Sequence, residues 1–163
     1  MIYENTYGFI PPHFFETIPD NMKYDVVIEY YTGADIIGKS LNKYIKAIKP
    51  FIPAEIAKEV AEYADSEGNI TVYRGGIFDK NPALYPSWTL DIDKAEWFAK
   101  RFLFQGDTVL YKGIIKPKDV IGFRWDRGES EIIQYQGVKK IEVIREYKKS
   151  EYDPDNVEKL ANE

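Results

Sequence analysis

The chain has 163 residues, of which 44% are hydrophobic and 15% aromatic, and its formal net charge is −5. This length and composition predict one globular domain with a single core, and the acidic balance argues against a duplex nucleic-acid binder, which needs a basic face. Because the chain has no cysteine, disulfides, zinc–thiolate sites and cysteine nucleophiles are excluded.

Residues 1–28 are predicted to form a leader that packs on the domain. The segment 1–19 contains Glu4, Glu16 and several prolines, without the basic start and unbroken apolar run of a signal peptide. No stretch approaches the roughly 18 apolar residues of a membrane span. We therefore expect no membrane partner and a cytoplasmic protein, or one in the host cytoplasm if it is phage-encoded or delivered.

Apolar residues at helical spacing predict three helices, at about 37–48, 53–66 and 93–104. Pro50 stops the first and Gly68 closes the second. Asp93 and Glu96 have capping-box spacing at the start of the third. The three stripes are Ile37, Leu41, Tyr44, Ile45 and Ile48; Ile56, Val60 and Tyr63; and Ala95, Phe98, Ala99 and Phe102.

Strand signals fall mostly after residue 68, with turn-forming residues in most of the gaps. Helices thus precede strands, with one helix between them, which predicts an α+β fold with a mainly antiparallel sheet. We assign residues 1–147 to one domain and 148–163 to a charged, solvated C-terminal tail. The predicted strands cover residues 70–74, 87–90, 108–115, 120–125, 131–135 and 138–145.

Arg74 ends the first predicted strand and is followed by Gly75 and Gly76. Glycines let a ligand approach the main chain, and a guanidinium fork suits a phosphate. A surface arginine before a glycine turn explains the same pattern. In the second strand, the hydroxyls of Ser87 and Thr89 face one way because they are two residues apart; this arrangement either orients a carboxylate or forms a hydroxyl ladder.

The segment Glu129-Ser130-Glu131 opens the fifth predicted strand. Two carboxylates two residues apart share a strand face, and such a pair suits a reaction with an oxocarbenium-like centre. A solvated acidic strand start is the alternative. On the third helix, Phe98 is read either as core or as a stacking surface for a heteroaromatic ring, and Arg101 either as a solvated charge or as a phosphate contact.

In this order, Arg74, Ser87-Trp88-Thr89 and Glu129-Ser130-Glu131 resemble the signature of the arginine–serine–glutamate mono-ADP-ribosyltransferases. The segment from Ser87 to Arg101 is similar to the enzymatic components of iota-type and insecticidal binary toxins. Tyr31-Thr32-Gly33 with Leu41-Asn42 matches an upstream family segment, so that the likeness covers about residues 29–145. Trp88 and Thr89 depart from the family's Ser-Thr-Ser.

The resemblance implies a split β-sheet around an NAD cleft and transfer of ADP-ribose from NAD to a protein side chain, without a metal. Arg74 would bind an NAD phosphate, Ser87 would orient Glu131, and Glu131 would stabilise the ribosyl cation. Glu129 would engage the acceptor, which a glutamate there implies to be arginine. The other implied contacts are Gly75, Thr89 and Phe98 with nicotinamide, Arg101 with the pyrophosphate, and Trp125 in a substrate-recognition loop at 123–128.

The resemblance also bears on the oligomeric state, the partner and the biological source of the protein. The binary toxins carry a second, inactive copy of the domain for docking, which this chain lacks, so we expect a freestanding monomer acting on an unidentified acceptor protein. Its lysine-, isoleucine- and tyrosine-rich composition suggests an AT-rich bacterial or phage genome. The alternatives are a catalytically silent binding protein or inhibitor of a host component, an NAD glycohydrolase, and a transferase acting on nucleic acid or a small molecule, of which the acidic balance disfavours nucleic acid.

Overall fold

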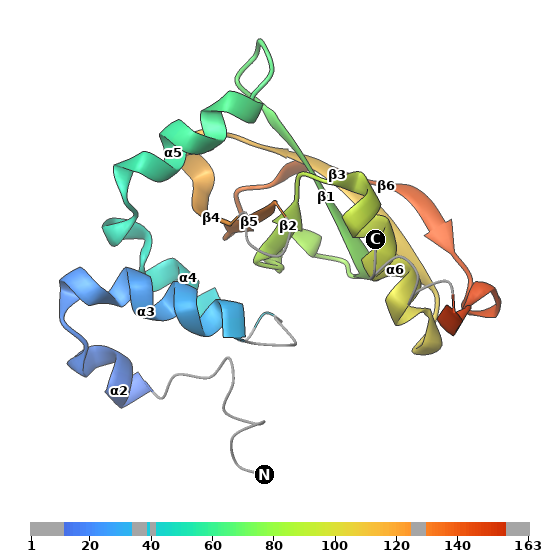
Figure 1. Ribbon diagram of the computed structural model, residues 1–163, viewed down its shortest axis with the longest axis horizontal. Helices are drawn as coiled ribbons and strands as arrows, with labels where there is room; N and C mark the ends of the chain where they lie inside the picture. Colours follow the sequence, from blue (N-terminus) through green and yellow to red (C-terminus); the bar gives the residue numbers. More distant parts are fainter. Residues whose placement is uncertain (1–11, 34–38, 40–41, 125–129, 156–163) are drawn as a thin grey trace.

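The computed structural model describes residues 12–33, 39, 42–124 and 130–155 (Figure 1). This part of the chain is an α+β fold with an open, six-stranded antiparallel sheet in the order β4-β5-β2-β1-β3-β6. The predicted class, α+β with a mainly antiparallel sheet, is confirmed.

The sheet has a long-strand half and a short-strand half. β1 pairs with β3 without interruption from Ile70 opposite Ile115 to Ile77 opposite Thr108. The two halves meet where Tyr73 of β1 pairs with Thr89 of β2. The long-strand half consists of β1 (Ile70–Ile77), β3 (Thr108–Ile115) and β6 (Lys139–Tyr147), and the short-strand half of β2 (Ser87–Thr89), β4 (Val120–Arg124) and β5 (Glu131–Gln134).

All six predicted strands are present; β3 has the predicted ends, and the other five differ from the prediction at one end or both. β1 continues beyond the predicted end at Arg74, through two glycines, as far as Ile77. Glycine is a poor strand former, but β3 offers a main-chain partner at every one of these positions. The pairing therefore overrides the local preference.

The helices cover the two faces of the sheet unequally. α3 and α4 pack on one face of the short-strand half, where Tyr24, Val27 and Ile45 form a core with Ile121 and Ile133, and α5 covers the opposite face (Figure 1). The helices are α2 (Pro12–Thr17), α3 (Asp20–Gly33), α4 (Asn42–Ala47), α5 (Ala54–Val60) and α6 (Ile92–Arg101), with 3₁₀ turns at Lys49–Phe51, Ala61–Tyr63, Pro82–Leu84, Phe102–Phe104, Pro117–Asp119 and Lys149–Glu151.

α6 packs along β1 and contacts it through its small residues. Ala95 and Ala99 are fully buried in a core with Leu103, Leu110 and Tyr147. These alanines belong to the predicted apolar stripe of the third helix. The predicted capping box is wrong, however: the N-cap is Asp91, whose carboxylate accepts from the main-chain N–H of Asp93 at 2.9 Å.

The other helix predictions differ from the structure at their ends. The first predicted helix is seen as α4 from Asn42, whereas residues 37–38 and 40–41 lie outside the described residues. The second begins one residue after Pro53 and changes to a 3₁₀ turn after Val60. The sequence analysis did not predict α3, because the apolar residues of this helix form no narrow stripe. The burial of α3 depends on contacts with β4 and β5.

The start of the predicted tail packs on the domain. The main-chain N–H of Lys149 donates to Asp107 at 2.8 Å, and the ring of Tyr152 lies 6.0 Å from that of Phe104. Residues 148–155 are nevertheless all exposed, and these two contacts join them to the turn that follows α6. Among the helices that the structure describes, none is long and apolar enough to cross a membrane.

Candidate functional site

Ser87 and Glu131 are joined by a short hydrogen bond between neighbouring strands. The Ser87 hydroxyl donates to Oε2 of Glu131 at 2.6 Å. In the β2–β5 register, Thr89 is opposite Glu131 and Ser87 is opposite Ile133, so these side chains share one face of the sheet. A charge-assisted bond of this length holds the carboxylate firmly. Both side chains are half-buried.

The second hydroxyl of the motif has a local role. The Thr89 hydroxyl accepts from the main-chain N–H of Asp91 at 3.0 Å. The Asp91 carboxylate in turn accepts from the main-chain N–H of Asp93 at the start of α6. Thr89 is almost fully buried. Its hydroxyl thus shapes the turn from β2 into α6.

Arg74 reaches the main chain of Ser87. Its Nη1 donates to the Ser87 carbonyl at 2.7 Å, and its Cζ lies 4.0 Å from the centre of the Tyr85 ring. The β1–β2 pairing occurs at Tyr73 and Thr89, and Ser87 lies beyond it. The guanidinium therefore supplies a donor where the neighbouring strand has diverged.

Strand alternation places the side chains of Arg74 and Glu131 on opposite faces of the sheet. Tyr73, opposite Thr89, shares the face of Glu131, whereas Arg74 is opposite Tyr111 of β3 and leaves β1 on the other face. The structure thus brings Arg74, Ser87 and Glu131 together as a chain of two hydrogen bonds. The arginine and the carboxylate approach Ser87 from its main-chain and side-chain sides, respectively.

Gly75 is required for close packing of α6 on β1. A Cβ atom at this position would lie 1.9 Å from the carbonyl oxygen of Ala95 and 2.7 Å from the main-chain nitrogen of Ala99. At Gly76, an added Cβ would meet nothing within 4 Å. The sequence reading ascribed Gly75 to ligand approach, and the structure shows in addition a packing reason for the glycine.

Phe98 and Arg101 lie on α6 in a surface cluster of aromatic rings. The Phe98 ring meets Trp97 edge-on at 4.8 Å and stacks on Phe102 at 6.5 Å. The guanidinium of Arg101, an exposed residue, lies 5.1 Å from the Trp97 ring centre. The contacts described for the two candidate residues are thus within residues 97–102.

Glu129 and Trp125 lie outside the described residues. The prediction that Glu129 lies beside Glu131 therefore stays a prediction; β5 itself begins at Glu131. Ser130 has a φ of 44°, in the left-handed region that non-glycine residues rarely adopt. Backbone strain of this kind is often found at functional sites, and here it immediately precedes the candidate carboxylate.

Sequence reasoning missed Arg124, which is directly opposite Glu131 in the β4–β5 register. Its half-buried side chain shares the carboxylate's face. The signal available in the sequence was a basic residue at the end of one predicted strand, with a short connection to the strand that starts at Glu131. Pairing these two predicted strands as a β-hairpin would have placed Arg124 opposite Glu131.

A second missed group contacts Arg74 through the Tyr85 ring. Asp79 forms an ion pair with Lys39 at 2.7 Å and accepts from the Tyr85 hydroxyl at 3.1 Å. The hydrogen bond from Lys39 lowers the pKa of Asp79, while burial and the neighbouring Asp79 raise the pKa of Tyr85. Lys39, Asp79 and Tyr85 have no shared sequence motif, so no local signal links them.

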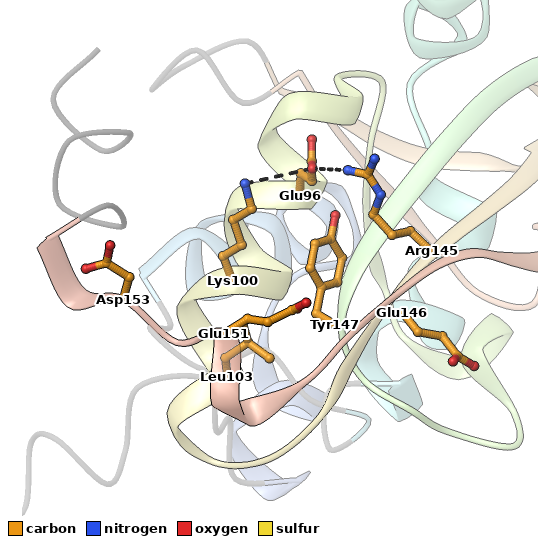
Figure 2. Close-up of a pocket in the computed structure, with 8 residues that line it drawn as sticks. All are labelled: Glu96, Lys100, Leu103, Arg145, Glu146, Tyr147, Glu151 and Asp153. Atoms are coloured by element: carbon orange, nitrogen blue, oxygen red, sulfur yellow. Dashed lines mark hydrogen bonds and ion pairs between the residues drawn. The ribbon is translucent and has the colours of Figure 1, made fainter.

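Two cavities are described, and neither is lined by Ser87 or Glu131. The first, of about 340 Å³, lies between α6 and β6, where Glu96 bonds Arg145 at 2.6 Å and approaches Lys100 at 3.9 Å (Figure 2). The second, of about 720 Å³, is lined by residues 78–84, Tyr111 and parts of 136–143. Among the residues that the structure describes, no cluster of acidic or histidine side chains could hold a metal ion.

Comparison with known proteins gives no relative: no family model, no curated protein and no solved structure matches the chain.

Proposed function

We propose that this protein is an NAD-dependent mono-ADP-ribosyltransferase that cleaves the nicotinamide–ribose bond and transfers ADP-ribose to a protein side chain, with arginine as the acceptor. The observation that carries the proposal is the chain of hydrogen bonds from Arg74 to Ser87 (2.7 Å) and from Ser87 to Glu131 (2.6 Å). The three residues are the three parts of the signature, and they come from three different strands.

The surroundings of Glu131 support a substrate with both cationic and anionic parts. The carboxylate is half-buried on a sheet face that α6 covers over β1 and that α3 and α4 cover over β4 and β5. The neighbouring strand β4 contributes the guanidinium group of Arg124 on this face, and Arg74 reaches the main chain of Ser87 from the other face. NAD has a positively charged pyridinium, which the Glu131 carboxylate complements, and a negatively charged pyrophosphate, which a guanidinium complements. The meeting of the two half-sheets at Tyr73 and Thr89 is compatible with a split-sheet ADP-ribosyltransferase fold.

The proposed reaction is a substitution at ribose C1′ with a dissociative transition state. The C1′–N bond breaks, its electron pair passes to the nicotinamide nitrogen, and the ribose becomes an oxocarbenium ion. Glu131 stabilises this cation through its negative charge, and Ser87 keeps the carboxylate aimed. The acceptor nitrogen then attacks C1′ and releases a proton, which Glu129 accepts.

The remaining proposed contacts follow the resemblance. Phe98 would stack on nicotinamide beside the main chain of Gly75 and near Thr89, and Arg101 would contact the pyrophosphate. Phe98 is half-buried and Arg101 exposed on α6, so both are open to solvent on the helix that begins directly after β2. Trp125 and Glu129 would contact the acceptor protein.

The test is Glu131→Gln in the full chain, with Glu62→Gln, an exposed glutamate on the Ala61–Tyr63 turn, as the matched control. A glutamine still accepts the Ser87 hydroxyl but has no charge. With labelled NAD and bacterial lysate, we expect wild type and Glu62→Gln to release nicotinamide and label protein. We expect Glu131→Gln to lose at least about 10²–10³-fold in rate with an unchanged melting temperature.

The outcomes separate the proposed function from its alternatives. Nicotinamide release without protein labelling identifies a glycohydrolase, and no release by wild type identifies a silent binding protein; either result overturns the transferase. Wild-type activity in Glu131→Gln contradicts the mechanism. A second variant, Glu129→Gln, should reduce transfer more than NAD hydrolysis.

A further inference from the structure

The guanidinium of Arg74 lies over an aromatic ring that fixes its orientation. Its Cζ is 4.0 Å from the Tyr85 ring centre, within the range of cation–π attraction. A guanidinium stacked face-on directs its N–H groups sideways, in the plane of the fork. One of these N–H groups donates to the Ser87 carbonyl. The position of the Tyr85 ring thus determines where this donor points.

Tyr85 is held at both ends. Its carbonyl accepts from Nε1 of Trp88 at 3.0 Å and from Nε2 of Gln134 at 2.6 Å, and both donors belong to fully buried side chains. Its hydroxyl donates to Oδ2 of Asp79 at 3.1 Å. The ring is therefore fixed from the core side by the main chain and from the surface side by a carboxylate.

Asp79 is in turn held from three directions. Its Oδ2 accepts from Lys39 at 2.7 Å, its Oδ1 accepts from the main-chain N–H of Asn81 at 2.7 Å, and its own N–H donates to the Tyr111 hydroxyl at 2.8 Å. Its side chain is 21% exposed. The carboxylate is thus a fixed support for the Tyr85 hydroxyl.

We propose that Tyr85 and Asp79 are positioning residues for Arg74 and, through it, for the Ser87–Glu131 pair. The contacts run from Asp79 to Tyr85, from Tyr85 to Arg74, and from Arg74 to the Ser87 carbonyl. Since β1 has diverged from β2 at Ser87, the guanidinium occupies the place of a strand partner, and its displacement shifts Ser87. The catalytic part of this inference rests on the proposed function.

The first experiment does not depend on activity. The chain has five arginines, so its arginine side-chain N–H signals are few in an NMR spectrum, and the Arg74 signal is assigned by its loss in Arg74→Lys. We expect the Tyr85 ring current to shift this signal upfield, because the guanidinium lies over the ring. We expect it to move downfield in Tyr85→Leu, to move little in Tyr85→Phe, and to stay unchanged in the control Tyr152→Leu. An unmoved signal in Tyr85→Leu overturns the inference.

The second experiment measures NAD turnover. Misplacing a reacting group by about 1 Å costs about 10²-fold in rate, so we expect Tyr85→Leu to lower kcat/KM by about 10- to 100-fold. We expect Tyr85→Phe, which keeps the stacked ring but loses the hydrogen bond to Asp79, and Asp79→Asn to lower it by similar factors, both smaller than that of Tyr85→Leu. In an Arg74→Met background, Tyr85→Leu should cause no further loss, because the two residues act in series.

Additive losses in that double variant overturn the positioning role, even if every single variant is impaired. If wild type turns over no NAD while the Arg74 signal responds to Tyr85→Leu, the proposed function fails and the positioning of Arg74 stands. The two failures are therefore distinguishable.

Discussion

The two halves of the sheet are held in different ways. In the long-strand half, β1 and β3 pair at eight successive positions, from Ile70 to Ile77 on β1. In the short-strand half, β2, β4 and β5 have three to five residues each, and side chains supplement the few ladder bonds. These side chains are Arg74 on the Ser87 carbonyl, Tyr24 on the Ile121 carbonyl, and Gln134 on the carbonyls of Ala83 and Tyr85.

This difference bears on the candidate site, because Ser87 and Glu131 both belong to the short-strand half. A ladder of main-chain bonds does not depend on residue type, whereas a side-chain bond is lost with one substitution. We therefore expect the stability of the long-strand half to depend mainly on packing. The stability of the short-strand half should depend also on individual polar contacts. Four predictions test this contrast, in order of decreasing effect.

The largest effect is expected for Gly75→Ala in the long-strand half. The new Cβ would collide with main-chain atoms of Ala95 and Ala99, which cannot rotate away, so α6 must move from β1. We expect a loss of about 3 kcal/mol or more in the free energy of unfolding, measured in urea. The matched control, Gly76→Ala, has open space and should change stability by less than about 1 kcal/mol. Equal effects at the two glycines would contradict the packing argument.

Gln134→Leu should give the next largest effect, in the short-strand half. Gln134 is fully buried; besides its two bonds to carbonyls, its Oε1 accepts from the N–H groups of Gly137 and Val138 at 2.7 and 3.2 Å. Leucine fills a similar volume but leaves these groups without their partner, at an expected cost of about 2–4 kcal/mol in urea unfolding.

The control for this prediction is Gln105→Leu, at an exposed position after α6, which should stay within about 0.5 kcal/mol of wild type. A Gln134→Leu protein as stable as this control would show that the short strands do not need side-chain support.

Tyr24→Phe tests a single polar contact and its pH dependence. Burial raises the pKa of Tyr24 to about 12, and its hydroxyl donates to the Ile121 carbonyl at 2.8 Å. Because the folded pKa lies above the unfolded value of about 10, this contribution is present below pH 10 and is lost as the pH rises toward 12. At neutral pH we expect Tyr24→Phe to lose about 1 kcal/mol.

Above pH 10, the wild-type advantage over Tyr24→Phe should shrink by about 1.4 kcal/mol per pH unit. Urea unfolding of both proteins from pH 8 to pH 11.5 measures this difference in stability. The contributions of the other titrating groups cancel, because both proteins contain them. A constant difference across the range would show that the Tyr24 hydroxyl ionises as readily in the folded protein as in the unfolded chain.

The smallest effect is expected for Asp79. The hydrogen bond from Lys39 lowers the pKa of this carboxyl group, so its contribution is present above the unfolded value near pH 4 and is lost as the pH falls through the folded pKa. Since the ion pair is partly exposed, we expect less than about 1 kcal/mol. Asp79→Asn and Lys39→Met should both show a smaller loss of stability than wild type between pH 5 and pH 2.5. A wild-type acid response in both variants would contradict this.

The candidate site was predictable in part. The residue types and their order on three of the predicted strands pointed to Arg74, Ser87 and Glu131, and the Ser87–Glu131 hydrogen bond has the partners that the resemblance implied. Arg124, Tyr85 and Asp79 were not predicted, because each acquires its significance from a strand register or from a contact between distant segments. Glu129, which strand alternation predicted to lie beside Glu131, is outside the described residues.

By itself, the sequence determined the six strands, the existence of α6 with its buried alanines, and the α+β class. These features follow from contacts two to four residues apart, which the apolar periodicity records directly. The tertiary structure alone decided that β1 continues through Gly75 and Gly76, that α3 is buried on β4 and β5, and that Arg74 bonds the Ser87 carbonyl. Each of these features requires a contact with another element of the fold. No local pattern of side chains specifies which main-chain groups remain unpaired where two strands diverge.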